Sequence, residues 1–199
     1  MNEWQGPGLL ALATGACAAG SAGALATFFA VGGPFSTIND VGNAATGVLS
    51  GWLAWRLRRA AAGRSMDLAT GSVLVGAALT VVGSWLVVSG TTGFLLAGLV
   101  SSLGFAGIGW SLVAISRDPA STVGWPPRLR ILGIAAGSLM ALGVVSIPGV
   151  LLRIDDMGTA PGWVWLGLMS WLGTYVAFPV WAIWFGVAHL RPATRRVTA

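Results

Sequence analysis

Residues 68–88 read LATGSVLVGAALTVVGSWLVV and contain no charged side chain. A helix rises about 1.5 Å per residue, so a helix over this stretch is about 30 Å long, which matches the hydrocarbon thickness of a bilayer. An uninterrupted apolar run of this length is typical of a transmembrane helix. We therefore predict that residues 68–88 form a helix that crosses a membrane.

The rest of the chain has the same apolar character. It has 199 residues, of which 55% are hydrophobic and only 9% are charged, and its mean hydropathy is +0.80. Soluble domains carry about 25% charged residues. With so few charges, the apolar stretches are interrupted too seldom for a soluble fold. The composition therefore indicates an integral membrane protein.

Five other apolar stretches are long enough to cross a bilayer, and glycine or proline marks most of the breaks between them. The sequence therefore predicts an all-α, polytopic membrane helix bundle. We expect six transmembrane helices that form a single transmembrane domain over residues 1–199. The predicted helices cover approximately residues 8–31, 35–55, 68–88, 93–115, 131–152 and 163–188.

The positions of the arginines predict how the helices are oriented. All 11 basic residues are arginines, and cationic residues in short loops are retained on the cytoplasmic side of a membrane. If the N-terminus is cytoplasmic, Arg153 is the only arginine on the outer side. We therefore expect an N-in/C-in, multi-pass protein of the plasma membrane, most simply a bacterial inner membrane. Because the arginines gather between apolar runs, the expected partner is the lipid bilayer and not a nucleic acid.

The second predicted helix, residues 35–55, carries its polar side chains on one face. At about 100° per residue, these side chains fall within an arc of about 120°. The opposite side of the helix is apolar, so the polar face must point at protein or at water. The polar face is formed by Ser36, Asn39, Asp40, Asn43, Thr46 and Ser50.

Asp40 is the only acidic residue within an apolar run, and an ionised carboxylate in lipid costs several kcal/mol unless it faces a cavity or a partner. We therefore predict a ligand or ion path along this face. A structural alternative is that Pro34 begins the helix and Asp40 merely stabilises its positive end. The deeper polar residues could equally serve as hydrogen bonds between helices. The predicted path is lined by Asn39, Asp40, Asn43, Thr46 and Ser50.

Charged residues that follow the fifth predicted helix lie on the same outer side as Asp40. Arg153 could neutralise Asp40, and Asp155 and Asp156 are further candidate partners. Pro148 is positioned to kink the fifth helix near its outer end. The alternative is an ordinary solvated loop whose charges bind nothing. Weaker candidates deeper in the helices are Thr80, Ser84, Ser101, Ser170, Thr174, Tyr175 and Trp171.

The residues that are absent exclude several kinds of site. Without lysine there is no retinal Schiff base and no phosphate-binding loop of the Walker type. With His189 and Cys17 as the only residues of their types, one chain cannot assemble a bis-histidine haem or a zinc site. No metal site and no catalytic residue is predicted, and the sequence leaves any other cofactor open.

The sequence favours a small solute or ion carrier, channel or binding protein whose polar site opens outward on the second helix. Asp40 would then set cation preference or carry a proton. An alternative is an accessory or assembly subunit of a larger membrane complex, or a homo-oligomer, because glycine-lined helices permit close helix contact. A lipid-modifying membrane enzyme has the least support, since only Asp40 points to it, and we expect a protein that is not an enzyme.

Overall fold

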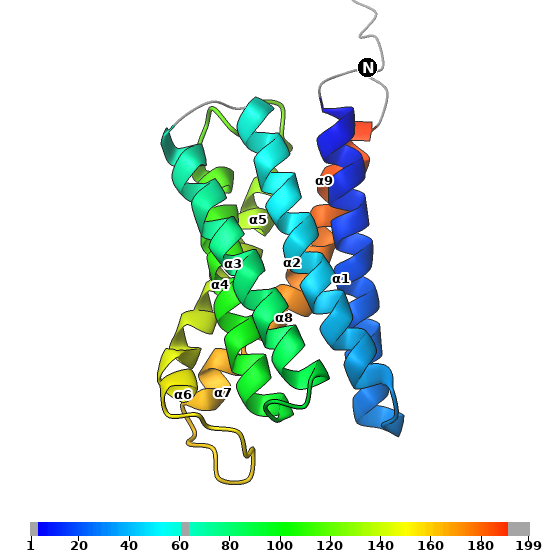
Figure 1. The fold of residues 1–199 in the computed structure, drawn as a ribbon. Helices are drawn as coiled ribbons and strands as arrows, with labels where there is room; N and C mark the ends of the chain where they lie inside the picture. Colours follow the sequence, from blue (N-terminus) through cyan, green and yellow to red (C-terminus); the bar gives the residue numbers. More distant parts are fainter. Residues whose placement is uncertain (1–3, 61–63, 191–199) are drawn as a thin grey trace, which may run out of the picture.

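The computed structural model describes residues 4–60 and 64–190, and over these residues it is a bundle of helices with no strand (Figure 1). Four long helices come first, and two interrupted helical segments follow them. The long helices are α1 (Gln5–Val31), α2 (Phe35–Ala60), α3 (Arg64–Val88) and α4 (Phe94–Arg117). Each forms where an apolar run was predicted to be helical.

The fifth and sixth segments each contain a change of helix type. The fifth consists of α5 (Pro127–Ala141), the 3-10 helix η1 (Leu142–Ser146) and α6 (Ile147–Leu151). The sixth consists of α7 (Val164–Leu168), α8 (Ser170–Leu172), the π-helix η2 (Gly173–Ala177) and α9 (Phe178–Leu190). The helix type changes just before Pro148, which has no N–H for an α-helical hydrogen bond to the preceding turn. The kink expected at Pro148 stays a prediction.

Five helical segments are long and apolar enough to cross a membrane, which fits a multi-pass membrane protein. They are Gln5–Val31, Met66–Val88, Phe94–Arg117, Pro127–Leu151 and Val164–Leu190. The helix α2 is equally long, but its polar face lowers its hydropathy below that of the other five. The count of six spans and the N-in/C-in orientation therefore stay predictions.

Neighbouring helices in the sequence pack side by side, and α1 also packs against α9. Consequently α1 begins at the same end of the bundle at which α2, α4 and α9 end (Figure 1). We call this end the arginine end, because Arg56, Arg58, Arg59 and Arg117 lie there. The opposite end carries the turns before α2 and α4 and the segment between α6 and α7.

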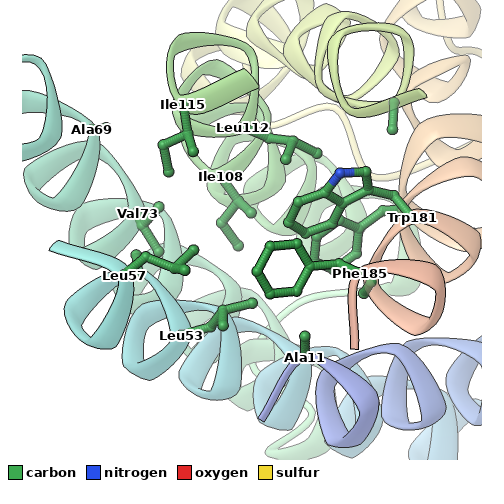
Figure 2. Packing of buried hydrophobic residues seen from close by; sticks show 14 of the residues in the cluster. Ala11, Leu53, Leu57, Ala69, Val73, Ile108, Leu112, Ile115, Trp181 and Phe185 are labelled. Carbon is green, nitrogen blue, oxygen red and sulfur yellow. The ribbon is translucent and has the colours of Figure 1, made fainter. Parts of the chain in front are cut away.

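Large apolar side chains fill the half of the bundle nearest the arginine end. Figure 2 shows side chains from α1, α2, α3, α4 and α9 that point toward one another. They leave a cavity of only about 30 Å³ with mainly apolar walls. We call this cluster the apolar plug, and its central members are Leu53, Leu57, Ile108, Leu112, Trp181 and Phe185.

We expect Gly104→Ala to destabilise the contact between α3 and α4. A Cβ on Gly104 would lie 2.6 Å from the carbonyl oxygen of Gly76 and 2.7 Å from the backbone nitrogen of Thr80. Both neighbours are backbone atoms, so the helices would have to separate at a cost of about 1–3 kcal/mol. Thermal unfolding in detergent micelles measures this loss.

The matched control is Gly71→Ala in α3, where a Cβ meets nothing within 4 Å. Alanine is the better helix former, so this variant is expected to unfold at the same temperature as the wild type or slightly above it. Equal melting temperatures for the two variants would contradict the close contact of α3 with α4.

Candidate functional site

The polar face of α2 points into the bundle. Asn39, Asp40, Asn43, Thr46 and Ser50 are all buried, whereas Ile38, Val41 and Val48 on the opposite side are exposed. This arrangement agrees with the amphipathic pattern of residues 35–55 and suits a helix whose outer side contacts hydrocarbon. The polar side chains must therefore find their partners within the protein or in enclosed water.

Two asparagines on α2 form a hydrogen-bonded cluster with one residue of α1 and one of η2. The Asn43 amide nitrogen donates to the Tyr175 hydroxyl oxygen at 2.8 Å and to Asn39 Oδ1 at 3.2 Å. The Asn39 amide nitrogen donates to the Ser21 carbonyl oxygen at 3.0 Å, and the Ser21 hydroxyl lies 2.9 Å from Asn43 Oδ1. We call Ser21, Asn39, Asn43 and Tyr175 the amide–tyrosine cluster.

Tyr175 reaches this cluster from the centre of the π-helix η2. A π-turn inserts one extra residue into a helix and rotates the face that follows, and such turns are frequent at functional sites. The turn is seated closely on the fifth segment, because a Cβ on Gly173 would lie 2.6 Å from the backbone nitrogen of Met140. The Tyr175 hydroxyl also lies 3.3 Å from the Asn39 amide nitrogen. Because this oxygen accepts from both asparagines, the Tyr175 O–H can donate a hydrogen bond to another acceptor.

Asp40 lies beside this cluster and is only 8% exposed. Within residues 4–60 and 64–190, no hydrogen bond or ion pair reaches its carboxylate. Asp40, Asn39, Asn43 and Tyr175 share the wall of a cavity of about 20 Å³. That volume holds about one water molecule. The remaining wall is mostly aromatic and hydroxyl side chains, among them Phe94, Phe105, Trp171, Ser101, Ser102 and Thr174.

Trp171 and Ser102 form one side of this cavity. The indole N–H of Trp171 donates to the Ser102 hydroxyl at 3.1 Å, and Phe94 meets the Trp171 ring edge-on. The deep indole predicted from the sequence thus has a polar partner, as a buried tryptophan requires. These side chains bring α4 and the sixth segment up to the polar face of α2.

The deeper part of the predicted path is packed differently. Ser50 donates to the carbonyl oxygen of Thr46 in its own helix at 2.7 Å. At Gly47, α2 lies directly against the Thr80 side chain of α3. Ser50 lines the cavity of the apolar plug instead of the polar cavity, and Thr46 lines neither. The five predicted residues therefore share one buried face, but only Asn39, Asp40 and Asn43 line the polar cavity.

The candidate partners of Asp40 have other contacts. The Asp155 carboxylate accepts hydrogen bonds from the backbone N–H groups of Gly93 at 2.5 Å and Leu96 at 3.0 Å. It thereby caps α4, whose first N–H groups have no partner within the helix. Asp156 accepts from the N–H of Gly158 in its own turn at 2.8 Å. Asp155 is thus exposed, as the solvated-loop alternative has it, but its carboxylate also holds the start of α4.

Arg153, which could neutralise Asp40, forms no ion pair with it in the described residues. An ion pair joins Arg58 to Asp67 instead. Arg153 follows α6 with a positive φ of 53° and lines a separate surface groove together with Asp155. The sequence placed Arg153 and Asp40 at the same end of the bundle, but loop conformation decides where the guanidinium points.

Ser21 is the member of the site that the sequence analysis missed. Serine in an apolar helix usually bonds to its own backbone, so its presence in α1 carries no signal. Tyr175 appeared only as a weak candidate, and its part in the site depends on the π-turn. For metals, the residues described contain no group of three or more His, Cys, Asp or Glu side chains that could hold an ion.

Comparison of the chain with family models, with curated proteins and with solved structures finds no match.

Proposed function

We propose that this multi-pass membrane protein binds a small monovalent cation, the proton included, at Asp40, and that it is a carrier or channel for that cation. The observation that carries the proposal is an aspartate that is only 8% exposed and whose carboxylate has no partner in the described residues, at the wall of a polar cavity. A buried charge is normally paired or coordinates a cation. In a membrane, an ionisable residue of this kind marks an ion pathway by default.

The size and chemistry of the cavity support a small cation over an organic solute. Its volume of about 20 Å³ suits one water or one ion of similar size. Because the Tyr175 hydroxyl accepts from the two asparagine amides, its proton is available to a water or a carboxylate oxygen in the cavity. A water held between Tyr175 and Asp40 would complete the coordination of a bound cation or relay a proton.

The position of the apolar plug supports the proposal that the cation reaches Asp40 from the end opposite the arginine end. Asp40 lies about 8 Å along α2 from the helix start at Phe35, at about 1.5 Å per residue. On the other side of it, the Gly47–Thr80 contact and the plug fill the bundle. With the proposed N-in/C-in orientation this end is the outer face, so the cation would reach Asp40 from outside.

Ion flux into proteoliposomes tests the proposal. In vesicles that carry a sodium or proton gradient, we expect Asp40→Asn to lower the flux at least tenfold, the factor that corresponds to about 1.4 kcal/mol. Asp156→Asn is the matched control, because it makes the same chemical change in an exposed turn. An unchanged rate for Asp40→Asn would remove the proposed role. A wild-type rate equal to that of empty vesicles would do the same.

A second candidate function is that of an accessory subunit or homo-oligomer, and it has one specific observation in its favour. A Cβ on either Gly20 or Gly23 of α1 would meet nothing within 4 Å. These helical glycines therefore serve no close contact with the described residues, although glycine lets helices approach closely in lipid. Native mass spectrometry from a mild detergent tests this candidate. A stable monomer would count against it.

A further inference from the structure

A groove runs along the outside of the bundle between α1 and α2 at the arginine end. In Figure 1 these two helices diverge toward that end. The groove has a volume of about 330 Å³. It is lined by Gly6, Leu9, Leu10 and Ala13 from α1 and by Trp52 and Arg56 from α2. Its walls are apolar along most of their length, and the guanidinium group of Arg56 lies at one end.

Arg56 differs from the two other arginines that end α2. Arg58 is paired with Asp67, and the guanidinium groups of Arg58 and Arg59 lie 5.7 Å and 5.3 Å from the centre of the Trp55 ring. Arg56 has no acidic or aromatic partner among residues 4–60 and 64–190.

The guanidinium of Arg56 instead rests in a notch of α1. A Cβ on Gly6 would lie 2.5 Å from Arg56 Nη2. The absence of a side chain at Gly6 is therefore what lets the guanidinium lie against α1. Arg56 thus remains an exposed, unneutralised cation at the end of an apolar groove.

We propose that this groove binds one anionic phospholipid. The phosphate would pair with Arg56, because a planar guanidinium matches two phosphate oxygens at once. An acyl chain would lie along Leu9, Leu10 and Ala13, of which Leu9 is 60% exposed. The Trp52 indole, 57% exposed, stands beside the groove in a position that suits the membrane interface.

The charge around the groove selects an anionic head group over a zwitterionic one. Arg58 and Arg59 lie close to Arg56 on α2, and Asp67 neutralises only Arg58. The local charge is therefore positive, and it repels the amine of a zwitterionic lipid while it attracts a net negative head group. The site is separate from the Asp40 cavity, which shares none of its lining residues.

Competitive lipid retention tests the proposal. The full chain in mild detergent is mixed with equal amounts of phosphatidylglycerol and phosphatidylcholine, and native mass spectrometry counts the lipids that stay bound. We expect one phosphatidylglycerol to be retained, and Arg56→Gln to lower its preference over phosphatidylcholine by about tenfold. Excess inorganic phosphate should not displace the lipid, because the apolar groove contributes to binding.

Two variants separate this site from a general attraction of charge. Arg59→Gln removes the same charge from the same helix but leaves the groove lining intact, so the preference should fall by much less than in Arg56→Gln. Gly6→Leu fills the notch without a change of charge and should lower retention of phosphatidylglycerol. Equal losses for Arg56→Gln and Arg59→Gln would overturn the proposal. A wild-type protein without preference, or an unaffected Gly6→Leu variant, would also overturn it.

Discussion

Asp40→Asn is expected to raise the melting temperature of the protein. Asp40 is only 8% exposed, and no donor in the described residues reaches its carboxylate, so the charge has no partner among those residues. A neutral amide of the same shape avoids much of that cost, which is about 2.5–3.5 kcal/mol for Asp at the centre of a membrane helix and less for Asp40, about 8 Å from the start of α2. The variant also loses the favourable interaction of the carboxylate with the helix dipole, which lowers its stability by only about 0.3–1 kcal/mol. We therefore expect a net stabilisation of about 0.5–2 kcal/mol, measured by thermal unfolding in detergent.

Asp155→Asn makes the same chemical change with the opposite expected sign. The Asp155 carboxylate accepts two backbone N–H bonds at the start of α4. Asparagine keeps one acceptor oxygen but loses the other and the negative charge, so the replacement should lower stability by about 0.5–1.5 kcal/mol. If Asp40→Asn lowers the melting temperature as Asp155→Asn does, Asp40 serves to stabilise the N-terminal end of α2. The cation proposal would then lose its main support. A stabilised variant that no longer carries the cation would show that this carboxylate is kept for function at a cost in stability.

Phe185→Ala is expected to be the most destabilising of the substitutions considered. Phe185 is fully buried in the apolar plug, and its ring centre lies 5.0 Å from that of Trp125 and 5.4 Å from that of Trp181. Truncation of a fully packed phenylalanine costs about 3–5 kcal/mol, because the cavity left behind closes only in part. Thermal or denaturant unfolding in micelles measures the loss.

Val180→Ala in the same helix is the control for this prediction. Val180 is exposed on the outside of α9, where truncation leaves no internal cavity, so its effect should stay within about 0.5 kcal/mol. Similar melting temperatures for the two variants would show that the plug is loosely packed. The inner half of the bundle would then not be closed, and the inference that Asp40 is reached only from the other end would fail.

The positions of the helices were predictable because bilayer thickness sets a minimum apolar length. The predicted boundaries fell short mainly where charged residues continue a helix. The predicted fifth helix begins at residue 131, whereas α5 begins at Pro127 and includes Arg128 and Arg130. A hydropathy criterion stops at the first charges, although proline favours the first helical turn and arginines are tolerated where the helix leaves the hydrocarbon. The extension of α2 to Ala60 has the same cause.

The inward direction of the polar face of α2 was predictable as well. Periodicity places Asn39, Asp40 and Asn43 on one side of a helix, and lipid forbids that side from facing outward. Periodicity does not say which residues of other helices meet that face. Tyr175 lies 132 residues from Asn43 in the chain, and its hydroxyl arrives through a π-turn that no local pattern announced.

By itself, the sequence determined that the chain is a bundle of apolar helices and that α2 turns its amides and carboxylate inward, since both follow from the energy of polar groups in hydrocarbon. Only the tertiary structure decided that Ser21 and Tyr175 bind the asparagines, that Asp155 caps α4 and that Asp40 has neither Arg153 nor any other described residue as a partner. Those contacts depend on helix rotation, on a π-turn and on loop conformation. Each is set by packing between segments far apart in the chain.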